Sequence, residues 1–167
     1  SGIHIPSLEI RGDYMDVIPY SDGSLALIMA DVSGKGIGSA MIMSMVKSAC
    51  TLLVKQEKTP EDIIREINGL IYEHTASDIF VTCIFIKLNA DRTSFISINA
   101  GHEVPLLKKS NGSIIALEKG CMVLGVLKEL HHLETEMLTI KCGDILCLYT
   151  DGVHDSSLHE KNLLFEL

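Results

Sequence analysis

The sequence lacks clusters of basic residues. Its 14 lysine and arginine residues are outnumbered by 22 aspartate and glutamate residues, which gives a formal net charge of −8 at pH 7. A protein that binds nucleic acid needs clustered cations to neutralise the phosphates. We therefore do not expect nucleic acid among the partners of this chain.

Long hydrophobic runs are also absent. The longest one, residues 40–54, is interrupted by polar side chains and is too short to span a bilayer. The first four residues lack the basic region and the apolar stretch of a secretory signal. With 167 residues, 47% of them hydrophobic, the chain is long enough to build a core of its own. We expect a single cytoplasmic domain over residues 1–167, with no membrane segment.

The five cysteines lack the paired Cys-x-x-Cys spacing of a zinc site. Most of them lie inside apolar stretches, where free cysteine is usually buried. We interpret them as reduced core thiols of a cytoplasmic protein. They are Cys50, Cys83, Cys121, Cys142 and Cys147.

Aspartates followed closely by glycine stand at the ends of strand-like apolar runs. Asp31 ends the run LALIMADV and is followed by Gly34 and Gly36, and Asp151 ends a second run before Gly152. An early acidic pair, Asp13 and Asp16, follows Gly12. Carboxylates that converge from strand ends make a site for a hard cation such as Mg²⁺ or Mn²⁺, which prefers oxygen ligands. The first hypothesis from the sequence is therefore a metal site that activates a water molecule for catalysis.

The first half of the chain predicts a strand and two helices. Residues 25–32 form an apolar run that two glycines terminate, and the apolar period becomes helical over residues 37–56. A second helix is predicted over residues 60–74, because Thr59 can cap it and Pro60 fits its first turn. The apolar stripe expected to face the core in the first helix consists of Ile37, Ala40, Met41, Met45, Ala49, Leu52 and Leu53. In the second helix it consists of Ile63, Ile64, Ile67, Leu70 and Ile71.

The second half predicts a meander of antiparallel strands. Beyond residue 77 the apolar period changes to two, and turn-forming residues separate the runs. The predicted strands cover residues 80–88, 94–99, 105–108, 113–117, 133–140 and 144–149. Helices followed by an antiparallel meander favour an α+β fold.

The aspartate motifs resemble those of a known family. Their order is Gly12-Asp13-x-x-Asp16, Asp31-Val32-Ser33-Gly34-Lys35-Gly36, Asn99-Ala100-Gly101-His102 and Tyr149-Thr150-Asp151-Gly152-Val153. Together they are similar to the PPM superfamily of metal-dependent protein serine/threonine phosphatases, in its bacterial SpoIIE/RsbU-like subgroup. The resemblance implies an αββα sandwich of two antiparallel sheets flanked by helices. It also implies two Mn²⁺ or Mg²⁺ ions where the loops of the sheets meet.

The resemblance also implies roles for individual residues. Asp31 matches the bridging carboxylate, with the Val32 carbonyl as a further ligand, and Asp151 matches a ligand from the opposite sheet. Asp13 and Asp16 match the early acidic pair, of which one member contacts a metal through water. With two ions, a water would attack a phosphoserine or phosphothreonine ester in line, and no protein nucleophile would be needed.

Three further residues near these motifs have two interpretations each. Lys35 faces the substrate phosphate as a point charge or is a solvated loop lysine. Arg11, which stands where the family has a glycine, contacts the phosphate or projects into solvent. His102 takes part in catalysis or belongs to a turn that packs beneath the site.

The chain departs from the family in one respect that leaves two function classes open. The family carries a further metal-binding aspartate beyond the Thr-Asp-Gly segment, and that carboxylate is missing here. Either the sequence is part of a longer chain, lacking the C-terminal strands, or it is a shortened natural variant. The first class is a phosphatase acting on a phosphorylated protein of the anti-sigma-factor-antagonist type, in a sigma-factor or stress-signalling partner switch. The alternative is a catalytically weakened regulatory or binding module.

The resemblance also implies regulation by a partner. Gly34 and Gly36 join the strand that carries Asp31 to the helix over residues 37–56. A movement of this helix, or of the helix over residues 60–74, would shift the predicted ligands. We expect a sensor domain or a regulatory protein to act on these two helices, with inert cover of the sheet as the alternative.

Overall fold

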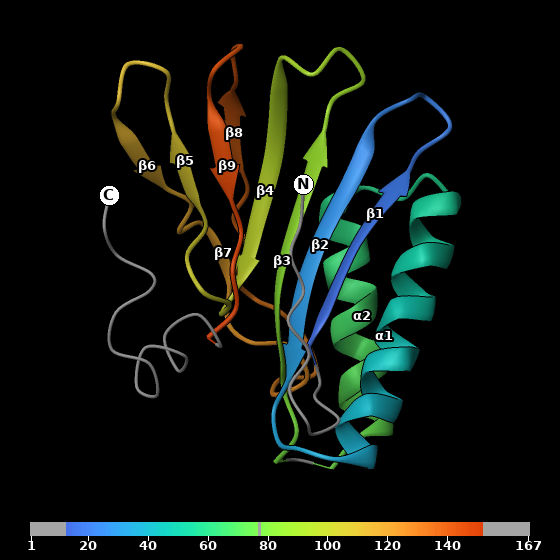
Figure 1. Ribbon diagram of the computed structural model, residues 1–167. Coiled ribbons are helices and arrows are strands. Elements are labelled where there is room, and N and C mark those ends of the chain that lie inside the picture. Colours follow the sequence, from blue (N-terminus) through green and yellow to red (C-terminus); the bar gives the residue numbers. More distant parts are fainter. Residues whose placement is uncertain (1–12, 77, 152–167) are drawn as a thin grey trace, which may run out of the picture.

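The computed structural model describes residues 13–76 and 78–151. These residues form two sheets and two helices (Figure 1). In chain order the elements are β1 (Tyr14–Pro19), β2 (Leu25–Val32), α1 (Ile37–Lys55), α2 (Pro60–His74), β3 (Val81–Leu88), β4 (Ser94–Ala100), β5 (Leu106–Lys108), β6 (Ile114–Ala116), β7 (Gly120–Cys121), β8 (Glu136–Thr139) and β9 (Ile145–Cys147).

The larger sheet has six strands in the order β1-β2-β3-β4-β7, with β8 also paired to β4. The smaller sheet has the order β6-β5-β9. The α+β class and the two sheets predicted from the sequence are therefore present. The prediction of purely antiparallel pairing is wrong at one place, because β7 runs parallel to β4. A strand of two residues gives no periodic signal that sequence reasoning can detect.

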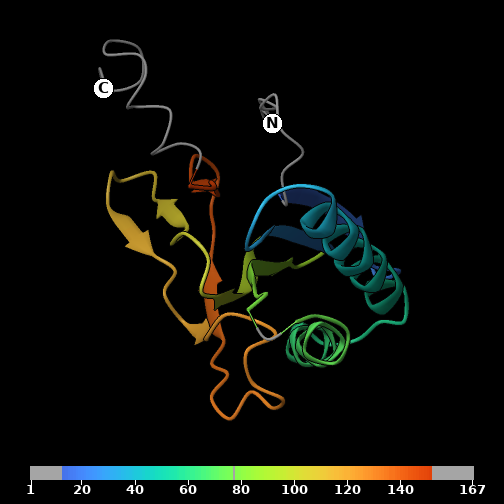
Figure 2. The same ribbon diagram turned by 90° about the horizontal axis from the view of Figure 1, so that it is seen from below.

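Both helices cover the same face of the larger sheet, as Figure 2 shows from below. Side chains from α1, α2 and the helix-facing side of β1, β2 and β3 form the larger core cluster. The smaller cluster lies between the two sheets and includes Met29, Ile84 and Leu107. Within the described residues no helix covers the smaller sheet, so the outer helical layer expected there is not seen.

Helix α2 begins and ends as the sequence predicts. The Thr59 hydroxyl accepts a hydrogen bond from the Asp62 backbone N–H at 3.2 Å, and Pro60 follows the cap. These features satisfy a backbone donor that would otherwise lack a partner at the helix start. Four of the five predicted stripe residues are buried, and Leu70 is half-buried.

Helix α1 presents a different face to the core than the sequence analysis predicts. Its buried side consists of Ser39, Met43, Val46, Cys50, Leu53 and Val54. Three members of the predicted stripe, Ile37, Met41 and Leu52, are 71%, 69% and 57% exposed. The helix is apolar nearly all round, so its periodicity could not show which side faces the sheet.

By length and composition alone α1 could cross a membrane, but core helices of soluble proteins pass the same test. In the structure α1 packs against α2, β1 and β2. Its fully buried residues Val46, Cys50 and Val54 belong to the core on the helix side of the sheet. The apolar composition of α1 is therefore consistent with its packing on the sheet.

The cysteines do not all lie in the core. Cys50 and Cys83 are buried and Cys121 is half-buried, and burial raises the pKa of the Cys50 thiol to about 12. Cys142 and Cys147 are exposed, so the prediction of core thiols is wrong for these two. All five are free thiols in the structure.

A buried asparagine ties α2 to the loop between β7 and β8. Asn68 is 1% exposed, and its Oδ1 accepts a hydrogen bond from the Gly125 N–H at 2.9 Å. Its Nδ2 donates to the carbonyl oxygens of Leu127 and Lys128 at 2.9 and 3.2 Å. Gly125 has φ +91°, and an added Cβ would lie 2.3 Å from the Ile71 side chain, so this turn needs glycine.

We predict that Asn68→Ala lowers the free energy of unfolding by about 2–4 kcal/mol, because it leaves buried backbone groups without partners. Urea denaturation measures this change. Asn111→Ala is the control, since Asn111 makes similar turn contacts at an exposed position. Equal losses in the two variants would show that the buried contacts of Asn68 add nothing.

An ion pair links two turns of the smaller sheet. Lys109 Nζ lies 2.5 Å from Asp144 Oδ2, and the Ser110 N–H donates to Asp144 Oδ1 at 2.8 Å. Asp144 thus fixes the turn after β5 to the turn before β9. The hydrogen bond from Lys109, and after it the one from Ser110, lowers the pKa of Asp144 to about 2.

A lowered carboxyl pKa stabilises the fold above the unfolded value of ~3.9, and this contribution is lost as the pH falls toward the folded value. We predict that unfolding free energy falls between pH ~4 and ~2 in the parent protein and falls less in Asp144→Asn. Denaturation curves over this pH range measure both slopes. Parallel curves would contradict the role given to this ion pair.

Candidate metal centre

Two of the predicted ligands face each other across the first two strands. The antiparallel register pairs Tyr14 with Ala30, so one step further it places Asp13 opposite Asp31. Tyr14 and Ala30 belong to the core on the helix side. Because side chains alternate along a strand, Asp13 and Asp31 point to the other side, toward the smaller sheet.

The third carboxylate comes from the smaller sheet. Asp151 follows β9 and is exposed, whereas Asp13 and Asp31 are half-buried. One carboxylate oxygen from each of the three lies within 4.8 Å of the other two. The structure therefore brings together Asp13, Asp31 and Asp151, which lie far apart in the sequence.

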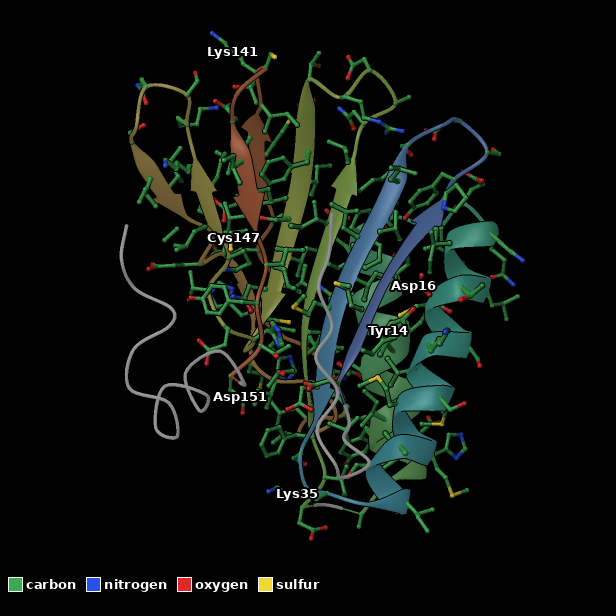
Figure 3. The ribbon with its side chains drawn as sticks, in the orientation of Figure 1. Tyr14, Asp16, Lys35, Lys141, Cys147 and Asp151 are labelled. Carbon is green, nitrogen blue, oxygen red and sulfur yellow. The ribbon has the colours of Figure 1, made fainter. Side chains whose placement is uncertain are left out.

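Asp16 does not join this group. It lies three residues after Asp13, and an odd separation along a strand puts two side chains on opposite faces. Its Oδ2 accepts a hydrogen bond from the Tyr14 hydroxyl at 3.0 Å, and its Oδ1 accepts one from the Val17 N–H at 2.8 Å. Figure 3 shows Tyr14 and Asp16 beside α1, well away from Asp151. The structure therefore does not group Asp16 with the other predicted ligands.

The remaining predicted site residues are placed as follows. Val32 is buried and directly follows Asp31 at the end of β2, so its carbonyl oxygen is one peptide away from that of Asp31. Lys35 is exposed in the loop before α1, at the bottom of the view in Figure 3. It does not line the cavity described below. Arg11 lies outside the described residues.

A cavity adjoins the carboxylates of Asp31 and Asp151. Its lining residues come from the ends of β2, β3 and β4 and from the segment after β9: Asp31, Ser33, Phe80, Thr82, Gly101, His102, Glu103, Thr150 and Asp151. The sequence analysis missed Ser33, Phe80, Thr82, Glu103 and Thr150 as site residues. Thr82 is found only once the pairing is known, because it is the register partner of Asp31.

His102 is held by the turn that begins at Asn99. The His102 N–H donates to Asn99 Oδ1 at 2.8 Å, and Asn99 Nδ2 donates to the His102 carbonyl at 3.1 Å. Burial lowers the pKa of His102, although nearby negative charges, first of all Glu103, oppose this shift. The imidazole is therefore neutral at physiological pH.

The chemistry of the three donors fits a hard divalent cation. All three offer carboxylate oxygen, and no histidine or cysteine joins the group within the described part of the chain. Oxygens that bind one Mg²⁺ at ~2.1 Å lie at most about 4.2 Å apart. A small inward shift from the separation in the structure, at most 4.8 Å, would satisfy this condition.

The charge of the three donors also suits a divalent cation. Carboxylates a few ångströms apart repel one another. A bound divalent cation removes this repulsion. The geometry thus favours Mg²⁺ or Mn²⁺ over zinc, which prefers nitrogen and sulfur ligands.

Comparison with known proteins identifies relatives of this chain. It is 28% identical over 152 residues to the phosphoserine phosphatase RsbU of Bacillus subtilis, a match that covers 90% of this chain and 45% of RsbU. The crystal structure of the RsbU and RsbW domains of Rv1364c from Mycobacterium tuberculosis superposes with a TM-score of 0.75 at 25% identity, covering 86% of this chain and 39% of that one. The chain thus spans less than half the length of these relatives.

A third comparison concerns a structure with a metal. The crystal structure of RsbX in complex with magnesium shares the fold, with a TM-score of 0.62 and 20% identity, and the match covers 81% of this chain and 63% of that one. The sequence profile described as "Stage II sporulation protein E (SpoIIE)" matches residues 21–167. Because this match covers most of the sequence, the chain belongs to the SpoIIE family, whose PPM-type serine phosphatase domains include that of RsbU.

Proposed function

We propose that this chain is a metal-dependent phosphatase domain that hydrolyses phosphoserine or phosphothreonine on a protein. The observation that carries the proposal is the convergence of Asp13, Asp31 and Asp151 beside an open cavity. Family membership and the phosphoserine phosphatase activity in the name of RsbU support it. The finer αββα architecture and the extent of the domain over residues 1–167 are part of the same proposal.

The residues of this chain supply a set of three carboxylate ligands. The β1–β2 ladder places Asp13 and Asp31 one step beyond its last pair, and Asp151 completes the set from the segment after β9. Two divalent ions, when bound, polarise the phosphoryl group and activate a water for in-line attack. Asp31 would bind both ions and the Val32 carbonyl would be a further ligand, and Lys35 and Arg11 remain candidates for contact with the substrate phosphate. The magnesium in the RsbX structure supports the choice of Mg²⁺ or Mn²⁺.

The substrate class follows from the relatives. We propose a phosphorylated protein of the anti-sigma-factor-antagonist type, in a cytoplasmic partner switch. The similarity to RsbU and to the RsbU–RsbW structure supports this choice. The other candidate function, a binding module with weakened catalysis, predicts that the chain binds metal and phosphoprotein without turnover.

We further propose that a sensor domain or regulatory protein acts on α1 and α2. The exposed apolar residues Ile37, Met41 and Leu52 give α1 a surface suited to such a partner. Gly34 and Gly36, with φ +89° and +92°, lie in the short loop that joins the end of β2 at Val32 to the start of α1. A displacement of ~1 Å at a catalytic site costs on the order of 10²-fold in rate, so a small movement of α1 would be enough.

We predict hydrolysis of an aryl phosphate in Mn²⁺ that stops on chelation, and a loss on the order of 10²-fold or more in Asp31→Asn. The reason is that this variant keeps the side-chain volume but removes the charge shared by the cations. Without metal its melting temperature should equal or exceed that of the parent, since it relieves carboxylate repulsion. Asp16→Asn is the matched control and should retain turnover. Hydrolysis that persists after complete chelation of the metal, or full activity in Asp31→Asn, would contradict the mechanism.

We predict that Met41→Glu and Leu52→Glu change the unfolding free energy by less than about 0.5 kcal/mol, because both side chains are exposed. When the regulatory domain or protein is present, the same substitutions should uncouple phosphatase activity from its input. Measurements of stability in this chain, and of turnover with and without that regulator, test both statements. Normal regulation in both variants would remove α1 as the regulatory surface.

A further inference from the structure

The ring of His102 is held in one position at the cavity. The residue is 8% exposed, and the two hydrogen bonds with Asn99 fix its backbone. Gly101, just before it, has φ +66°, and an added Cβ would lie 2.4 Å from the Val123 side chain. A side chain would clash here, so the turn before His102 requires glycine.

One ring nitrogen is linked to β3, the strand that pairs with the one carrying Asp31. His102 Nδ1 lies 2.9 Å from Thr82 Oγ1, and Thr82 Oγ1 lies 3.5 Å from the Asp31 backbone oxygen. Thr82 is also the register partner of Asp31. Because Nδ1 is much closer than the Asp31 oxygen and the other side of the ring faces the Tyr149 backbone, we assign the hydroxyl proton to Nδ1 and the ring proton of the neutral imidazole to Nε2. With this assignment Thr82 makes no hydrogen bond to Asp31.

The other ring nitrogen, Nε2, lies near the segment that follows β9 of the smaller sheet. His102 Nε2 is buried and makes no hydrogen bond of good geometry among the described residues. The backbone of Tyr149 lies beside the ring, two residues before Asp151. A buried N–H without a full partner is costly, so a closer approach of the segment that carries Asp151 would be favourable.

We propose that His102 is a positioning residue for the metal centre. Through Thr82 it is fixed to β3 at the position opposite Asp31, and through Nε2 it draws in the segment of Asp151, so it sets the distance between ligands from two sheets. This inference rests on the proposed function, because it assumes that these carboxylates bind metal. Residues that do not bind the metal but orient its ligands through hydrogen bonds typically contribute about 10–100-fold to metal affinity.

The test measures Mn²⁺ affinity by calorimetry in the 167-residue chain, together with the melting temperature without metal. Thr82→Val keeps the shape of the side chain and removes the hydroxyl, and His102→Leu removes both ring nitrogens. Ser97→Ala is the matched control, because Ser97 also carries a buried hydroxyl on the same sheet, with no described hydrogen bond. Asp31→Asn reports on the metal centre itself.

We expect Thr82→Val and His102→Leu to weaken Mn²⁺ binding about tenfold or more, and Ser97→Ala to leave it unchanged. The double variant should bind as weakly as His102→Leu alone, because Thr82 and His102 act through one chain of contacts. Parent-like Mn²⁺ affinity in Thr82→Val and His102→Leu, with binding lost in Asp31→Asn, would overturn the role of His102 alone. Parent-like affinity in Asp31→Asn would overturn the metal centre and this inference together.

Discussion

The antiparallel register of β1, β2 and β3 is the constraint on which the site depends. It sets Asp13 opposite Asp31 and Asp31 opposite Thr82 at one end of the larger sheet. Ladder hydrogen bonds and two packed faces hold these strands and so hold the backbone of Asp31 opposite its neighbours. A slip of one residue in either β1 or β2 would turn its aspartate toward the helices and separate Asp13 from Asp31.

The smaller sheet completes what the register begins. Its β9 leads to Asp151, and the apolar contacts between the sheets fix how closely that residue approaches Asp31. The helices lie on the opposite face and do not line the cavity. Chemistry and regulation can therefore occupy different sides of one sheet, joined by the two glycines between β2 and α1.

Sequence reasoning could identify the three converging aspartates, because glycine-flanked carboxylates at strand ends carry their own signal. It could also place β2 and α2, whose ends are marked by glycines and by a Thr-Pro cap. Asp16 lies apart from these three, as strand alternation alone predicts from its separation from Asp13. The buried face of α1 and the role of Thr82 could not be predicted, because both depend on which elements pack or pair in three dimensions.

The most direct measurement of the central claim is the anomalous scattering of crystals soaked in Mn²⁺. The account predicts a strong peak among the carboxylates of Asp13, Asp31 and Asp151, with Asp31 in contact with the ion and Asp16 still bonded to Tyr14. A peak ligated by Asp16, or no peak among the three carboxylates at saturating Mn²⁺, would contradict it.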